Sequence, residues 1–292
     1  MTEKNEFITL PTTFEKYKWY KPILVFIIGA VVYIILSIIL TLIFDVAFGE
    51  HFTTSLMDGG YEVMNGEMGQ IFSDLSVIIM IPSLYIGAKI VKDRPFSSYV
   101  SSYGGWNYKL YLKALVIPAI IMIIFEGISL AFNGAEGTSH FSIGFLIICL
   151  ILVPLQCIAE EYVFRGLIMQ TFGSWFKIPV LAVVLQAIVF GLIHGYNSLG
   201  NITIIISGLL MGIIAWKSNG IEVSSAMHTA NNFIIAMTVM FGLTVTSSTV
   251  GLTDTIIAIV LDVVIFAAMY YAGIKTDWFG ERKETELLFP LE

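Results

Sequence analysis

Long apolar segments occupy most of this chain and decide what it can fold into. Eight segments of roughly 20 residues could each cross the apolar layer of a bilayer as a helix. They cover residues 23–44, 70–91, 110–132, 142–168, 179–199, 201–216, 221–242 and 254–274. Only 13% of the residues are charged, about half the share in an average soluble domain. The sequence therefore predicts an all-α polytopic membrane protein, a bundle of about eight transmembrane helices.

Positively charged residues gather at one set of helix ends. The first, third, fifth and seventh connections between the apolar segments contain no Lys or Arg, although the chain has 15 of them. Cytoplasmic connections carry the excess of Lys and Arg in membrane proteins, so both termini are predicted to be cytoplasmic. The expected organisation is a cytoplasmic segment over 1–22, one transmembrane domain over 23–274 and a charged cytoplasmic tail over 275–292.

Two connections at the positively charged ends are predicted to lie along the membrane surface. The shorter one covers 171–178, and the longer one covers 94–109. Aromatic side chains anchor such segments at the level of the lipid headgroups. In the longer connection the candidate anchors are Tyr99, Tyr103, Trp106 and Tyr108.

Three short motifs place ionisable or amide side chains inside or beside the apolar segments. They are Glu160-Glu161-x-x-x-Arg165, Phe190-x-x-x-His194 and His228-x-x-x-Asn232. Ionisable groups are costly within a membrane, and where they occur they usually mark a functional site. Carboxylates, imidazoles and an amide are the groups that activation of water requires.

The two glutamates are expected to have different roles. On a helix Glu161 and Arg165 share a face and can form an ion pair, while Glu160 is turned about 100° away from Glu161. We therefore expect Glu161 and Arg165 to fix the helix end and Glu160 to face a cavity as a general base. Taken alone, the motif fits a charged helix end among the lipid headgroups equally well.

Two histidines in the apolar segments complete a candidate site, with Phe190 as a wall beside His194. Together with Glu160, His194 and His228 could supply three ligands to a zinc ion and leave a position for water. In a metal-free alternative, Glu160 and His194 activate water, while His228 and Asn232 stabilise the oxyanion. The residues leave both alternatives open.

The depth of His194 is in tension with this site. If Arg165 lies at the cytoplasmic surface, Glu160 is about 7 Å deeper, whereas His194 is about 22 Å deep when counted from Lys177. The histidine can join the site only if the 166–178 stretch dips below the surface or the fifth helix is strongly tilted.

Taken together and in this order, the motifs resemble those of the CPBP intramembrane proteases, the family of CAAX prenyl endopeptidases and bacteriocin-processing enzymes. That family carries Glu-Glu-x-x-x-Arg, Phe-x-x-x-His and His-x-x-x-Asn or Asp on about eight helices. The motifs span residues 160–232 of a protease-like core at about 142–242. The resemblance implies that Glu160 is the base or a metal-bound carboxylate, and that His194 and His228 position the water or the metal.

The resemblance implies an intramembrane endopeptidase that acts on a membrane peptide or a lipidated protein, in a cavity open to the cytoplasm. Two alternatives from other classes remain: a non-catalytic bacteriocin-immunity or envelope scaffold protein, and a proton-coupled transporter. The transporter would use the carboxylates of Asp74, Glu126 and Asp262, which also lie in apolar segments.

The expected surroundings of the protein are a lipid bilayer, and the Lys- and Ile-rich chain favours a bacterial cytoplasmic membrane. No cluster of basic residues is interleaved with aromatic ones, so nucleic acid is not an expected partner.

Overall fold

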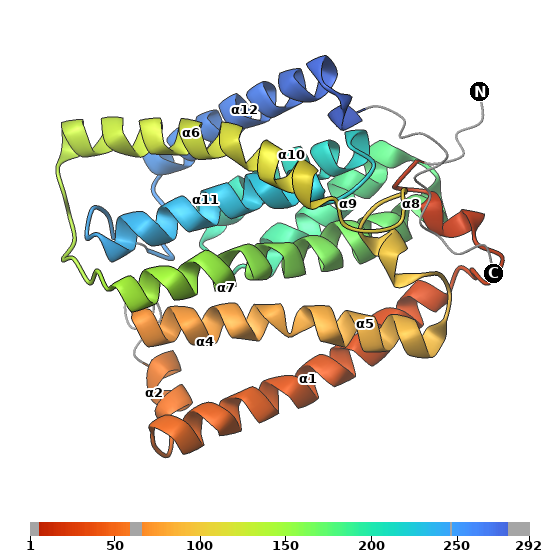
Figure 1. The fold of residues 1–292 in the computed structure, drawn as a ribbon, viewed down its shortest axis with the longest axis horizontal. Helices are drawn as coiled ribbons and strands as arrows, with labels where there is room; N and C mark the ends of the chain where they lie inside the picture. Colours follow the sequence, from red (N-terminus) through yellow and green to blue (C-terminus); the bar gives the residue numbers. More distant parts are fainter. Residues whose placement is uncertain (1–5, 59–65, 246, 280–292) are drawn as a thin grey trace.

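The computed structural model describes residues 6–58, 66–245 and 247–279, and every named element within these ranges is a helix (Figure 1). The predicted all-α fold class is confirmed. The longer helices are α1 (Lys21–Phe48), α2 (Phe52–Asp58), α4 (Glu67–Ile78), α5 (Met80–Val91), α6 (Tyr108–Asn133), α7 (Ile143–Glu161), α8 (Gln170–Phe176), α9 (Pro179–Leu192), α10 (Ser198–Lys217), α11 (Glu222–Met240) and α12 (Leu252–Lys275). A π-helical stretch, η3 (Tyr162–Met169), joins α7 to α8 without a break.

In the described part of the chain, six helical segments are long and apolar enough to cross a membrane, against about eight predicted. The difference comes from α9 and α11. α9 has 14 residues and spans about 21 Å, less than the roughly 30 Å of a bilayer core. α11 is long enough but carries Ser224, Ser225, His228, Asn231 and Asn232. α11 is enclosed between α6 and α7 and so needs no lipid-facing apolar surface. α9 packs against α10 but exposes Val180, Ile188 and Leu192.

The positively charged residues of the described chain mark one end of the bundle. α1 begins there and α12 ends there (Figure 1). Lysines flank five helices at this end, which we call the cationic end: Lys21, Lys92, Lys109, Lys217 and Lys275. Assignment of the cationic end to the cytoplasm follows the positive-inside rule and stays a prediction.

Parts of the predicted organisation fall on residues that the structure does not describe. Lys4, Arg282 and Lys283 lie outside the described residues, as do residues 1–5 of the predicted N-terminal segment and 280–292 of the predicted tail.

Two chain segments fold over the cationic end as a cap, which we define as residues 6–13 and 93–107. Phe7 and Ile8 of the first segment are fully buried. In the second segment Tyr99 is fully buried and Tyr103 is nearly so, and a Cβ on Gly166 would lie only 2.5 Å from the carbonyl oxygen of Tyr99. The prediction that Tyr99 and Tyr103 anchor the segment in lipid headgroups is therefore wrong, because both rings are enclosed by protein.

α1 stands at the edge of the bundle and packs mainly against α5 (Figure 1). Small residues let the two backbones approach closely, as is common between membrane helices. At Gly87 of α5 an added Cβ would lie 2.7 Å from the carbonyl oxygen of Val25, and at Gly29 of α1 it would lie 3.5 Å from that of Ser83.

The Gly87→Ala variant is expected to lower the free energy of unfolding by about 1–3 kcal/mol, because the new methyl group overpacks a backbone contact that cannot give way. Unfolding in detergent, followed by circular dichroism against temperature or denaturant, measures the change. Gly127→Ala on α6 is the matched control, since an added Cβ there meets nothing within 4 Å. Equal stability of the two variants would contradict this account of the α1–α5 contact.

Candidate functional site

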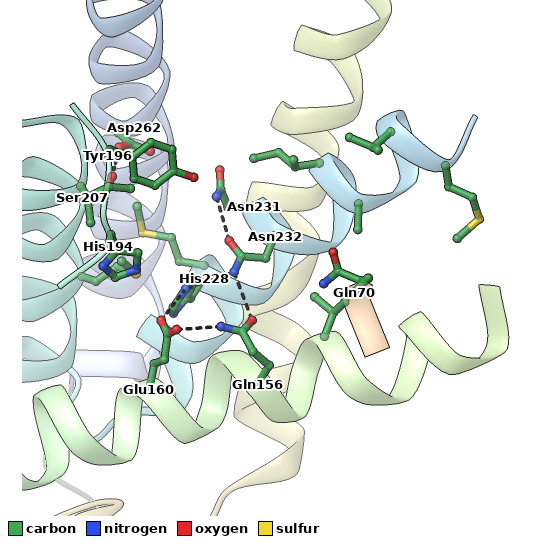
Figure 2. A pocket seen from close by; sticks show the side chains of 18 of the residues that line it. Gln70, Gln156, Glu160, His194, Tyr196, Ser207, His228, Asn231, Asn232 and Asp262 are labelled. Atoms are coloured by element: carbon green, nitrogen blue, oxygen red, sulfur yellow. Dashed lines mark hydrogen bonds and ion pairs between the residues drawn. The ribbon is translucent and has the colours of Figure 1, made fainter. Parts of the chain in front are cut away.

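The structure brings the predicted site residues together around one cavity of about 350 Å³, enclosed by α4, α7, α9, α10, α11 and α12 (Figure 2). Its lining includes Glu160, Phe190, His194, His228 and Asn232. These residues come from three helices and from the turn after α9, so the cavity unites motifs that lie up to 72 residues apart in the sequence. The roles assigned to the individual residues stay predictions.

Glu160 lies in the last turn of α7 and is 8% exposed. Its Oε1 atom accepts a hydrogen bond of 2.8 Å from Gln156. Its Oε2 atom is buried, accepts no hydrogen bond from the described residues and lies 3.5 Å from Nε2 of His228. A buried carboxylate oxygen without a donor is costly. This oxygen is therefore the position in the cavity where a water molecule or a substrate group would be held most readily.

Glu161 and Arg165 form the predicted ion pair, with Nη1 of the arginine 2.7 Å from Oε1 of the glutamate. Neither side chain is exposed, so the alternative of a charged helix end among lipid headgroups is wrong. The arginine also donates to the carbonyl oxygen of Gly208 at 3.2 Å and lies over the ring of Phe190 at 4.6 Å. Thus Phe190 covers the buried cation as well as walling the cavity.

His228 lies between the two glutamates. Its Nδ1 atom is 3.2 Å from Oε1 of Glu161, and its Nε2 atom faces Glu160 and the amide nitrogen of Asn232, which is 3.4 Å away. The carboxylate of Glu161 contacts two further donors, since Arg165 donates to the same oxygen at 2.7 Å and Ser224 donates to the other oxygen at 2.7 Å. A carboxylate accepts only, so Nδ1 of His228 carries a proton and Nε2 is the atom presented to the cavity.

His194 lies in the turn after α9, and its Nδ1 atom is 2.6 Å from the carbonyl oxygen of Phe190. A carbonyl oxygen accepts only, which places the proton on Nδ1 and leaves a lone pair on Nε2. The ring packs edge-on against Phe190 with 4.5 Å between centroids, and it lines the cavity. Its Nε2 atom is therefore available as a proton acceptor.

Part of the stretch 166–178 lies beneath the cap: Gly173 is in contact with Ile8, and the buried Gln170 bonds to Arg94 and to the carbonyl oxygen of Ser98. Its last residues, including Phe176 and Ile178, are exposed. α9 is short, and His194 in the turn after it lines the cavity. The depth of this stretch in the membrane stays a prediction.

A chain of hydrogen-bonded side-chain amides connects Asn232 to Glu160. The sequence analysis did not identify Gln156, which stands between them. Asn231 donates to Asn232 at 3.1 Å, and Asn232 donates to Gln156 at 3.2 Å. Gln156 in turn donates to Glu160, four residues ahead on the same helix face. The signal that could have found Gln156 is its position, since it is a lone amide one turn before a glutamate in an otherwise apolar segment.

The predicted zinc ligands do not form a set in this arrangement. Within residues 6–58, 66–245 and 247–279, no three His, Cys, Asp or Glu side chains are grouped closely enough to hold a metal ion. Glu160 and His228 approach each other, but His194 does not join them as a third ligand, and Glu161 is already occupied by Arg165, Ser224 and His228. Binding of a metal ion by Glu160, His194 and His228 stays a prediction.

Comparison with known proteins supports the motif-based resemblance. Residues 142–234 match the family model described as type II CAAX prenyl endopeptidase Rce1-like, a region that contains all three motifs. The predicted resemblance is confirmed over this region, and the matched family is one of CAAX-type proteases. The uncharacterized protein YyaK of Bacillus subtilis (strain 168) is 27% identical over 178 residues, which are 56% of this chain and 59% of that protein. No solved structure matches the chain significantly.

The Arg165→Met variant is expected to lose about 3–5 kcal/mol of stability, because it leaves the charge of Glu161 buried without its partner. The double variant Glu161→Gln/Arg165→Met should lose less than the sum of the two single variants, since it removes both charges at once. Unfolding in detergent measures all three, with Lys109→Met at the exposed start of α6 as a control expected within about 0.5 kcal/mol. Additive losses would show that the two side chains do not interact as described.

Proposed function

We propose that this chain is an intramembrane endopeptidase in which Glu160 activates water for hydrolysis of a peptide bond. The observation that carries the proposal is the buried, unpartnered Oε2 atom of Glu160, which lies beside Nε2 of His228 in a cavity inside the bundle. The match of residues 142–234 to the Rce1-like endopeptidase family supports the same reaction class.

The reaction begins at the unpartnered oxygen of Glu160. A water molecule held there transfers a proton to the carboxylate as its oxygen attacks the carbonyl carbon of the scissile bond. The π electrons of that carbonyl move to its oxygen, which becomes an oxyanion. When the tetrahedral intermediate collapses, the C–N bond breaks and the proton on Glu160 passes to the leaving amine. Glu160 thus serves first as base and then as acid, and no other reactant is consumed.

The two histidines and Asn232 support this sequence. Asn232 presents amide hydrogens on the side of the cavity next to Glu160, where they can stabilise the oxyanion, and a His228 protonated on both nitrogens would add an N–H at Nε2. The buried pair of Glu161 and Arg165 holds His228 in one orientation. The lone pair on Nε2 of His194 is a second acceptor that can orient the attacking water.

The substrate class follows from the membrane setting. We propose a membrane peptide or a lipidated protein as substrate, and the bacterial cytoplasmic membrane as the location of the enzyme. The six apolar helical segments and the similarity to a Bacillus protein support this location. The distribution of Lys and Arg supports an orientation with the cationic end in the cytoplasm.

Replacement of the proposed base is the direct test. Glu160→Gln is expected to lower the cleavage rate by about 10²- to 10⁴-fold, the usual contribution of a general base, without a change in stability comparable to that of Arg165→Met. The measurement uses purified protein in detergent, a panel of lipidated and unlipidated peptides, and mass spectrometry of the products. Glu126→Gln on α6, a carboxylate outside the cavity lining, is the matched control.

The same preparation decides between the two mechanisms. About one zinc ion per chain, lost together with cleavage on chelation, would overturn the metal-free mechanism and restore the zinc alternative. A folded Glu160→Gln protein that keeps full activity in cells would overturn catalysis itself and favour the bacteriocin-immunity or scaffold alternative.

Gln156 is expected to act through Glu160 as a positioning residue. Gln156→Leu removes a hydrogen bond to a charged group, which is worth about 1.5–3 kcal/mol, so kcat should fall by about 10- to 100-fold with a small change in KM. Gln70→Leu is the control, because Gln70 also lines the cavity but donates to Asp74 instead. An equal fall in kcat for Gln156→Leu and Gln70→Leu would contradict a specific positioning role for Gln156.

A further inference from the structure

Among the described residues that line the cavity, the exposed ones lie at one end of the bundle. Three lining residues are exposed, namely Gly66, Glu67 and His140. Glu67 begins α4, and His140 lies in the connection before α7. Both helices begin at the end of the bundle opposite the cationic end (Figure 1). The cavity therefore opens away from the cationic end, and the expectation of an opening to the cytoplasm disagrees with the lining.

Buried side chains block the path from the cavity to the cationic end. Just beyond Glu160 the ring of Phe164 packs on that of Phe190 with 4.8 Å between centroids, and Arg165 fills the space beside them without any exposure. The cap lies over this layer, where Arg94 donates to the carbonyl oxygen of Gly166 at 3.1 Å. An aromatic pair, a buried ion pair and a hydrogen-bonded cap thus separate Glu160 from the cationic end.

The route from the mouth to Glu160 is suited to a polypeptide backbone. Polar side chains recur along it, in contrast to the apolar outer surface of the bundle. They include Glu67 and Gln70 near the mouth, Tyr196 and Asp262 on one wall, and Asn231 and Asn232 next to Gln156 (Figure 2). None of the described lining residues is Lys or Arg, so a free terminal carboxylate would find only histidines as cationic partners.

We infer that substrates enter the cavity from the end opposite the cationic end, which the positive-inside rule assigns to the extracytoplasmic side. The substrate class is then an exported or membrane-anchored polypeptide whose cleavage segment lies in the outer half of the bilayer. Translocation must precede cleavage, and a lipidated protein confined to the cytoplasm is not a substrate. The substrate part of this inference rests on the proposed function, whereas the side of entry does not.

Cysteine accessibility tests the side of entry independently of catalysis. Ser207→Cys and Ala236→Cys each place a thiol in the cavity lining, and neither residue belongs to the proposed catalytic set. Ala236→Cys is the milder change, because Ser207 bonds to Asp262. Glu50→Cys and Lys18→Cys are exposed controls at the two ends. The wild-type protein gives the background, since Cys149 and Cys157 are both buried.

A membrane-impermeant maleimide is applied to right-side-out and to inside-out membrane vesicles. The cavity thiols are expected to be labelled together with Glu50→Cys in right-side-out vesicles, while Lys18→Cys is labelled only in inside-out vesicles. Labelling of the cavity thiols on the same side as Lys18→Cys would overturn the inference. Labelling from neither side would overturn it as well, because the cavity would then have no aqueous mouth.

The cleavage assay distinguishes a failure of this inference from a failure of the proposed function. If the labelling pattern is as expected, attachment of a bulky maleimide to Ala236→Cys should also abolish cleavage of the peptide panel by that variant. If labelling is as expected but Glu160→Gln cleaves at the full rate, the proposed function fails while the side of entry stands. If Glu160→Gln is inactive but the cavity thiols are labelled from the cationic side, the function stands and the inference fails.

Discussion

The buried ion pair of Glu161 and Arg165 is the interaction on which the rest of the site depends. Two charges without any exposure carry a large desolvation cost, which is offset only when every remaining donor and acceptor finds a partner. Here most of the partners come from three other helices: Ser224 and His228 on α11, the carbonyl oxygen of Gly208 on α10, and the ring of Phe190 on α9. Within the described residues, only Nε of Arg165 in this pair has no hydrogen-bond partner. The pair therefore draws α7, α9, α10 and α11 to one point. Because Glu161 points into this contact, Glu160 is turned toward the cavity. Arg165 lies in the π-helical stretch that starts at Tyr162, and such stretches are frequent at functional sites.

Sequence reasoning succeeded where the determining forces are local. Hydropathy locates the helices, because each backbone polar group in a membrane must be satisfied within its own segment. The spacing of Glu161 and Arg165 is one helical turn, so their pairing could be predicted. Sequence reasoning failed where a contact joins distant parts of the chain. Glu161 contacts His228, which lies 67 residues later in the sequence, and nothing in the glutamate motif indicates this second partner. The buried positions of Tyr99 and Tyr103 likewise depend on the close approach of the cap to Gly166, which no aromatic pattern encodes.

Asp74 and Asp262 are better explained as carboxylates beside the cavity than as parts of a proton pathway. Asp262 lines the cavity wall and accepts a hydrogen bond from Ser207, and Asp74 accepts one of 2.7 Å from Gln70 behind the mouth. Glu126 lies on α6 and is not among the lining residues. A proton-coupled transporter would require these groups to form a relay through the bundle. Instead, Asp262 with Ser207 forms part of the cavity wall, and Asp74 holds the lining residue Gln70 beside the route to Glu160.

The position of Glu160 relative to the mouth constrains the conformation of any substrate. His228 lies 12 residues before the end of α11, and lining residues Val239 and Met240 occupy that end. The route along α11 is therefore about 18 Å long. An extended segment covers this distance with about five or six residues at roughly 3.3 Å each, whereas a helix needs about twelve. In a helix the carbonyl carbon is also shielded by the surrounding turns, and its oxygen is engaged in the internal hydrogen bond that the oxyanion donors would have to replace. An extended chain exposes its carbonyl groups and can bond to the amides of Asn231, Asn232 and Gln156 as it passes. The cavity thus favours a substrate whose cleaved segment is already unwound, such as one end of a membrane anchor or the stretch next to it.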